Sequence, residues 1–135
     1  MACYGMRLSN GNGSNGICFN QRDPRKENIE MAKLRDLAKV IRSKNAGALL
    51  LTLDVMFDDE AVFRKVKGSG TLSPRTIASL YNVSDNEVEV IPFDVALAIK
   101  ITMPRQTIAG SPGDSDVYGA QQHAPLMEIE IEDTL

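Results

Sequence analysis

The sequence is short of the residues that usually mark redox, metal or membrane sites. Its 135 residues include no tryptophan, one histidine and two cysteines, Cys3 and Cys18. Neither cysteine has the Cys-x-x-Cys or Cys/His spacing of a zinc or dithiol site, so we interpret both as free thiols. The first ten residues lack the apolar stretch of a signal peptide, and no segment approaches the ~20 apolar residues of a membrane span. We therefore expect a cytoplasmic protein with no membrane partner.

An excess of charge of one sign is also lacking. The net charge is −3, from 15 basic and 18 acidic residues that are intermixed along the chain. Such a chain has no basic field for a phosphate backbone, so we expect no nucleic-acid partner. There is no internal repeat and no glycine-rich phosphate motif, and we expect no cofactor.

The chain divides into a tail and one domain. Residues 1–30 are rich in Gly, Asn and Ser and have too few apolar side chains to repay the entropy cost of ordering, which predicts a flexible tail. Residues 31–135 are long enough to bury a core of their own, and we expect them to form a single α+β domain.

Alternation of apolar and polar residues predicts the strands of this domain. The strand expected at residues 49–57 is apolar on both faces, which is typical of a central strand covered on both sides. The last strand has an acidic outer face. The expected strands are residues 49–57, 87–91, 97–103 and 127–131.

Capping residues predict two helices. Acidic residues open a helix at 58–68 that Gly68 ends, and Ser73 with Pro74 starts a second one that runs to residue 81. Residues 31–45 have helical apolar spacing but adjoin a strong strand, so they favour a helix only narrowly. The expected fold is α+β, with two helices on one face of a mainly antiparallel sheet.

The loop at residues 111–125 is the main candidate site, because it concentrates polar side chains and shape-setting Gly and Pro residues. Asp114 and His123 are the candidates for proton transfer, since an unperturbed histidine titrates near neutral pH. Tyr118, Gln121 and Gln122 suit a ligand, a partner surface or the loop's own backbone equally well. With no EF-hand or His-x-x-x-His pattern, we expect no metal. The remaining ligand-binding candidates in the loop are Ser111, Gly113, Asp116, Tyr118, Gln121 and Gln122.

A second candidate group is Arg42, Ser43, Lys44 and Asn45, in which two cations adjoin a hydroxyl and an amide. Arg and Lys can hold a carboxylate or a phosphate, so this group predicts an anion site. The alternative is a solvated hairpin turn. Asp54 lies in an otherwise apolar strand, and we interpret it as paired inside the fold with Arg42 or Lys100.

Three motifs resemble a known family. Residues 34–47, 51–57 and 110–125 resemble DUF4387, a small family of unknown function whose members are associated with AtuA-like proteins (acyclic terpene utilisation). The likeness covers roughly residues 31–131.

A weaker likeness, carried by the Leu-x-Asp-Leu-Ala motif at residues 34–38, is to the ferredoxin-like C-terminal domain of AtuA-like proteins themselves. It implies a ferredoxin-like fold in which residues 34–41 are a strand and residues 42–47 are a loop. For residues 34–41 we therefore predict a strand, although their apolar spacing alone narrowly favours a helix. Lys44-Asn45 replace the Gly-Asp of that loop, so its chemistry need not transfer.

The resemblance implies a small subunit or partner of an AtuA-like protein in carboxylate or acyl-CoA catabolism. Arg42 and Lys44 would hold the anion, and Asp114 and His123 would transfer a proton in a hydration, dehydration or isomerisation step. The alternative is a non-catalytic ligand-binding or scaffold module, bound to that protein or to copies of itself. The ligand hypothesis predicts that both loops line one concave pocket, whereas the scaffold hypothesis predicts that they lie apart or on a flat partner-binding face.

Overall fold

The computed structural model describes residues 30–133. Both cysteines and almost all of the predicted tail lie outside the described residues, while Glu30 begins a strand. The helices and strands in chain order are β1 (Glu30–Lys33), α1 (Leu34–Leu37), β2 (Val40–Asn45), β3 (Leu50–Met56), α2 (Glu60–Ser69), α3 (Pro74–Tyr81), β4 (Glu89–Phe93), β5 (Ala98–Pro104), α4 (Ala124–Met127) and β6 (Glu130–Asp133).

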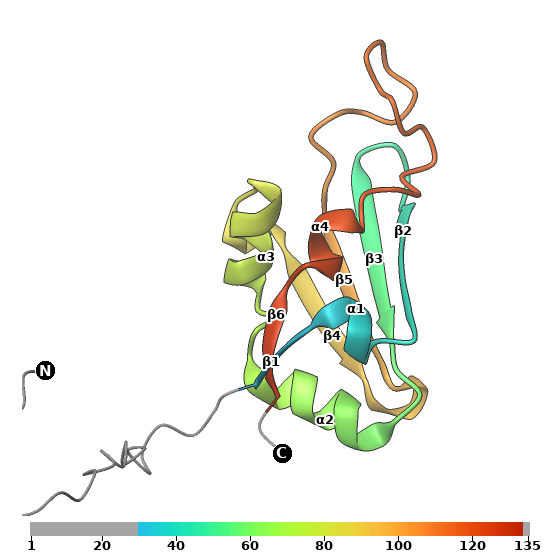
Figure 1. Ribbon diagram of the computed structural model, residues 1–135. Coiled ribbons are helices and arrows are strands. Elements are labelled where there is room, and N and C mark those ends of the chain that lie inside the picture. The colour runs from blue at the N-terminus through green and yellow to red at the C-terminus, as the bar shows by residue number, and fades with distance from the viewer. Residues whose placement is uncertain (1–29, 134–135) are drawn as a thin grey trace, which may run out of the picture.

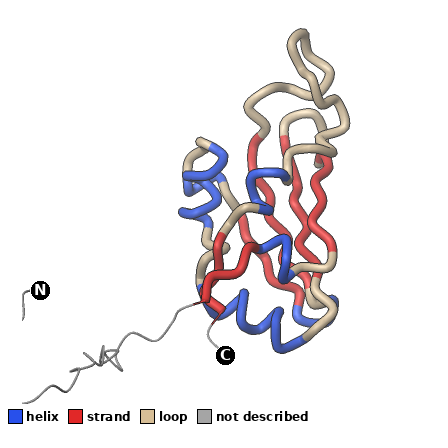
Figure 2. The backbone as a smooth tube through the Cα atoms, viewed as in Figure 1, coloured by secondary structure: helices blue, strands red, loops and turns tan. Residues whose placement is uncertain are grey.

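The strands form two antiparallel sheets. The larger has the order β2-β3-β5-β4, and the smaller joins β1 to β6. Figures 1 and 2 show the small sheet, α1 and α4 in front of the large sheet, with α2 and α3 beside them. The α+β class with antiparallel pairing is confirmed. The ferredoxin-like arrangement is not confirmed, because α2 and α3 follow one another between two hairpins instead of alternating in the order βαββαβ.

One hydrophobic core holds these layers together. Alternate residues of β3 and β5 meet buried side chains of α2 and α3 in a single cluster. The members from these four elements are Leu51, Leu53, Val55, Phe63, Val66, Ile77, Ala78, Ile99, Ile101 and Met103. The helices therefore cover the face of the sheet that these residues form.

The opposite face of β3 carries Thr52 and Asp54, which are buried as well. The Arg42 guanidinium lies against Asp54, with Nε donating to Oδ2 over 3.0 Å. The predicted pairing of Asp54 with Arg42 is confirmed. This face of the central strand thus carries an ion pair whose Arg42 side chain is 53% exposed, so the predicted cover on this side is not an apolar layer.

Local capping explains the two longer helices. The Asp59 carboxylate accepts hydrogen bonds from the amides of Ala61 and Val62 at the start of α2. This helix runs past the predicted stop and ends at Ser69, where Gly70 takes a left-handed φ of 68°. Ser73 caps α3 as predicted, by accepting from the amide of Thr76.

Two predicted strands are wrong in part. Residues 34–37 form the short helix α1, because the buried Leu34 side chain enters the core and its amide donates to the carbonyl of Ile129. The strand follows at Val40–Asn45, so residues 42–45 belong to β2 and not to a loop. Residues 124–127 form α4 with Leu126 buried, and the last strand begins only at Glu130.

Leu53→Ala should lower the free energy of unfolding by about 2–5 kcal/mol, because it empties a fully buried position at the centre of β3. Leu50→Ala is the matched control, since Leu50 lies in the same strand and is 42% exposed; its cost should be about 0.5 kcal/mol or less. Urea denaturation measures both values. Equal costs for the two variants would contradict the placement of the core.

Candidate functional site

The polar loop packs against one end of the large sheet. The Ala109 amide donates to the Ala48 carbonyl over 3.0 Å, and the Asn45 amide donates to the Tyr118 carbonyl over 3.2 Å. In Figure 1 the loop, in orange, extends beyond the turn that joins β2 to β3. The loop therefore lies over the β2–β3 hairpin, where it meets Ser43 and Asn45 of the second predicted group.

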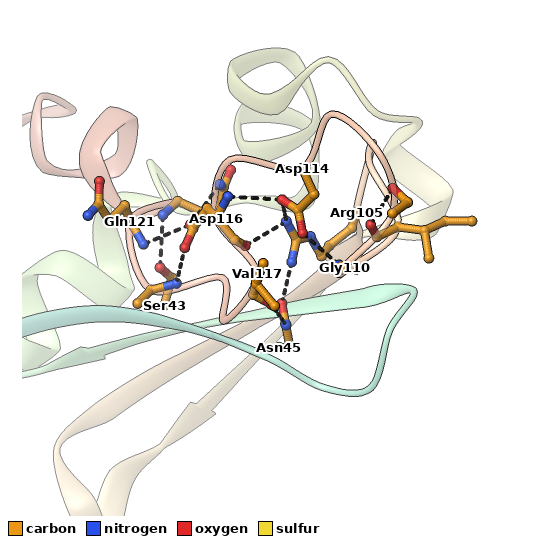
Figure 3. Close-up of polar contacts among 12 residues, drawn as sticks. Ser43, Asn45, Arg105, Gly110, Asp114, Asp116, Val117 and Gln121 are labelled. Atoms are coloured by element: carbon orange, nitrogen blue, oxygen red, sulfur yellow. Dashed lines mark hydrogen bonds and ion pairs between the residues drawn. The ribbon is translucent and has the colours of Figure 1, made fainter.

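An ion pair between Arg105 and Asp114 lies at the centre of the loop. Nη2 of Arg105 is 2.9 Å from Oδ1 of Asp114, and the two side chains are only 5% and 3% exposed. The same guanidinium donates to Oδ1 of Asn45 and to the Asp116 carbonyl (Figure 3). Arg105 follows β5 directly, so this side chain connects the end of one strand to the hairpin and to the loop.

Backbone amides complete the surroundings of Asp114. Its Oδ2 accepts from the Gly110 amide over 2.8 Å, and its Oδ1 accepts from the Asp116 amide over 3.0 Å. These two amides, and the Arg105 guanidinium beside them, hold the pKa of the Asp114 carboxyl below its usual value. The carboxylate is therefore ionised at neutral pH and is occupied in shaping the loop.

Asp116 organises the following turn in the same way. Its carboxylate accepts from the amides of Gln121 and Ala120, each over 3.0 Å, and from Nε2 of Gln122 over 2.9 Å. These hydrogen bonds lower the pKa of the Asp116 carboxyl. The largest effect comes from the Gln121 amide, and smaller ones come from the Gln122 side chain and the Ala120 amide. Both loop carboxylates thus have internal partners.

The end of the loop is fastened to β2 and α3. Ser43 Oγ accepts from the Gln122 amide over 3.0 Å and lies 3.4 Å from Nδ1 of His123. On the other side, the Tyr81 hydroxyl donates to the Gln122 carbonyl over 2.8 Å, and burial raises the pKa of Tyr81 to about 12. His123 is therefore half-buried beside a buried serine.

Gly119 allows the closest approach between the loop and the hairpin. Its φ is 66°, and a Cβ added there would overlap Oδ1 of Asn45. On the same side, Nδ2 of Asn45 donates to the Val117 carbonyl over 2.6 Å (Figure 3). A left-handed residue without a side chain is therefore required at this position.

The predicted anion group is split between two faces of β2. Ser43 and Asn45 face the loop, whereas Arg42 and Lys44 alternate with them and lie on the other face of the sheet. The predicted residues Gly113, Asp114 and Gln122 line a cavity of about 390 Å³ that also borders the end of α3. Arg42 and Lys44 do not line it. Ligand binding by these residues stays a prediction.

The other predicted residues lie nearer the surface. Ser111 donates to the Ile108 carbonyl within its own turn, while Gln121 is exposed and Tyr118 is 83% exposed. Sequence reasoning missed Arg105 and Tyr81, which lie outside the motif. Within residues 30–133 no three His, Cys, Asp or Glu side chains gather as a metal site, and no helix has the length and apolar character to cross a membrane.

The model of the family described as Domain of unknown function (DUF4387) matches residues 34–130. The chain belongs to this family. The DUF4387 match runs from α1 to the start of β6 and includes the whole loop. No curated protein and no solved structure matches the chain.

Gly119→Ala should open the DUF4387 loop more than Gly113→Ala does. Both glycines have positive φ, so each substitution costs about 1–2 kcal/mol of left-handed strain, but only at Gly119 does the new Cβ also overlap Asn45. Hydrogen exchange of the Asn45 amide, which bonds to Tyr118, measures the opening. Equal loss of protection in the two variants would contradict the close approach.

The loop should also open in acid. An Asp carboxyl titrates at about pH 3.9 in an unfolded chain, and both loop carboxyls have lower folded pKa values. Their bonds therefore contribute stability that is present above about pH 4 and is lost as the pH falls through the lowered folded values. NMR titration of the Gly110 and Ala120 amides should give midpoints below about 3.9. Midpoints at or above that value would contradict the assignment.

Proposed function

We propose that this DUF4387 protein is a small non-catalytic subunit that binds a larger protein through the loop end of the fold. The observation that carries the proposal is a group of exposed apolar side chains on the loop and the adjoining hairpin, which we call the apolar end. Its members are Leu49, Ile108, Val117 and Tyr118. Apolar side chains exposed together are typical of protein-binding surfaces.

The bracing of the loop supports this proposal. Val117 and Tyr118 are both held to Asn45 through their carbonyls, and Asn45 is in turn bound by Arg105. A surface that is ordered before the partner arrives loses less conformational entropy on binding. The loop therefore presents Tyr118 as a preformed anchor.

The state of the loop carboxylates favours the subunit over the enzyme. A general acid or base works best when its pKa lies near the working pH, but the pKa values of Asp114 and Asp116 are lowered by internal hydrogen bonds. Arg42, the proposed anion ligand, is paired with Asp54 on the other face of β2. Asp114, one of the two residues proposed for proton transfer, and Arg42, one of the two proposed for anion binding, are thus engaged with other residues.

The choice of partner rests on the resemblance. We propose an AtuA-like protein, so that the role of this chain in carboxylate or acyl-CoA catabolism comes through that complex. The ferredoxin-like likeness to the C-terminal domain of AtuA-like proteins remains part of this proposal. A homo-oligomer built on the same end is the competing assembly, and the experiment distinguishes the two.

Val117→Ser combined with Tyr118→Ser should weaken binding to an AtuA-like protein from the same host. Loss of two interface anchors costs about 2 kcal/mol or more, which corresponds to roughly thirtyfold in affinity. Co-purification with mass spectrometry identifies the complex, and calorimetry with the purified pair gives the Kd. The matched control is Phe93→Ser with Val95→Ser, since both residues are exposed but lie around the β4 end, away from the loop.

Recovery of the tagged chain alone as a homo-oligomer would contradict the proposed partner. An equal loss of affinity in the two double variants, or no loss in either, would contradict the proposed surface. Turnover of a carboxylate or an acyl-CoA thioester by the isolated chain, abolished by His123→Ala, would replace the subunit with an enzyme.

A further inference from the structure

The cavity of about 390 Å³ is distinct from the apolar end. It lies between the end of α3, the residues that follow β5 and the loop, and its accessible apolar wall includes Leu80 of α3 and Pro104 at the end of β5. Its volume falls within the range of small-molecule pockets in proteins, roughly 300–1,000 Å³. No residue of the apolar end lines it.

The cavity has no net charge. Among its lining residues only Arg105 and Asp114 are charged, and these two are paired at 2.9 Å. Arg105 also donates to Asn45 and to the Asp116 carbonyl. A ligand carboxylate that approached Arg105 would therefore be repelled by the Asp114 carboxylate. A ligand cation that approached Asp114 would be repelled by the Arg105 guanidinium. Either charge would also lose hydration on entry without gaining an unpaired partner.

The rim of the cavity offers neutral hydrogen-bonding groups. Asn82 at the end of α3, Thr107 after β5 and Ser115 in the loop all line it. All three residues are exposed at this rim. Amide and hydroxyl groups both donate and accept, so the three can bind a ligand that does the same.

We propose that this cavity binds a small uncharged ligand that carries amide and hydroxyl groups on an apolar carbon frame. Such a ligand places its carbon frame against Leu80 and Pro104 and its polar groups at the rim. The proposal differs from the carboxylate expected from the sequence, and it does not depend on the apolar end or on a protein partner.

Panthenol and pantothenate form a matched pair of probes. Panthenol is an uncharged amide with hydroxyl groups, and pantothenate has the same frame with a carboxylate in place of one hydroxymethyl group. In titrations of the full chain followed by NMR, panthenol should shift the amide signals of Asn82, Thr107 and Ser115 in a saturable way. Its Kd should be at least about tenfold lower than that of pantothenate, as expected when a buried charge lacks a partner.

Two variants test the origin of this preference. Asp114→Asn leaves Arg105 unneutralised and should shift the preference towards pantothenate by tenfold or more. Because Asp114 also shapes the loop, Ser115→Lys serves as a second variant, which adds a positive charge at the rim without removing an internal bond. It should shift the preference in the same direction.

The proposal would be overturned if panthenol gave no saturable shift, if wild type bound pantothenate as tightly as panthenol, or if Ser115→Lys left the preference unchanged in a folded protein. The Val117→Ser/Tyr118→Ser variant separates this result from the proposed function. It should bind panthenol as wild type does, whatever its effect on the protein partner.

Discussion

The Arg105–Asp114 ion pair is the interaction on which the loop and its surroundings depend. One guanidinium bonds to the hairpin through Asn45 and to the loop through the Asp114 carboxylate and the Asp116 carbonyl. Each carboxylate of the loop then orders backbone amides around itself. The cavity beside the loop is neutral because this pair uses the charges that a ligand would otherwise meet. The exposed end depends on the same guanidinium through Asn45, which bonds to the carbonyls of Val117 and Tyr118.

The elements that sequence analysis located well are those with local signals. Alternation over β3 and β5 and the Ser73-Pro74 start of α3 depend only on neighbouring residues. The short helices α1 and α4 have no comparable signal, because four residues cannot form a stable helix without tertiary contacts. Leu34 owes its place to the hydrogen bond that its backbone amide donates to the carbonyl of Ile129, far away in the sequence.

The site was partly predictable for the same reason. Composition identified the loop, since Gly, Pro and Asp residues there have to set unusual backbone angles. Composition could not assign roles, because Arg105 lies outside the motif and the partners of Asp114 and Asp116 are set by the folded backbone. Treating residues 42–47 as a loop also concealed the two-residue period that places Arg42 and Ser43 on opposite faces of β2.

The pairing of β1 with β6 has a consequence for synthesis on the ribosome. Glu30 pairs with Asp133 and Lys33 with Glu130, so the first described strand has the last one as its only strand partner within residues 30–133. The hairpins and helices between them can pair as they emerge, but the small sheet cannot close until residues 130–133 have left the exit tunnel. The small sheet therefore forms only after residues 130–133 have been translated. The hydrogen bond from the Leu34 amide to the Ile129 carbonyl also forms late in synthesis.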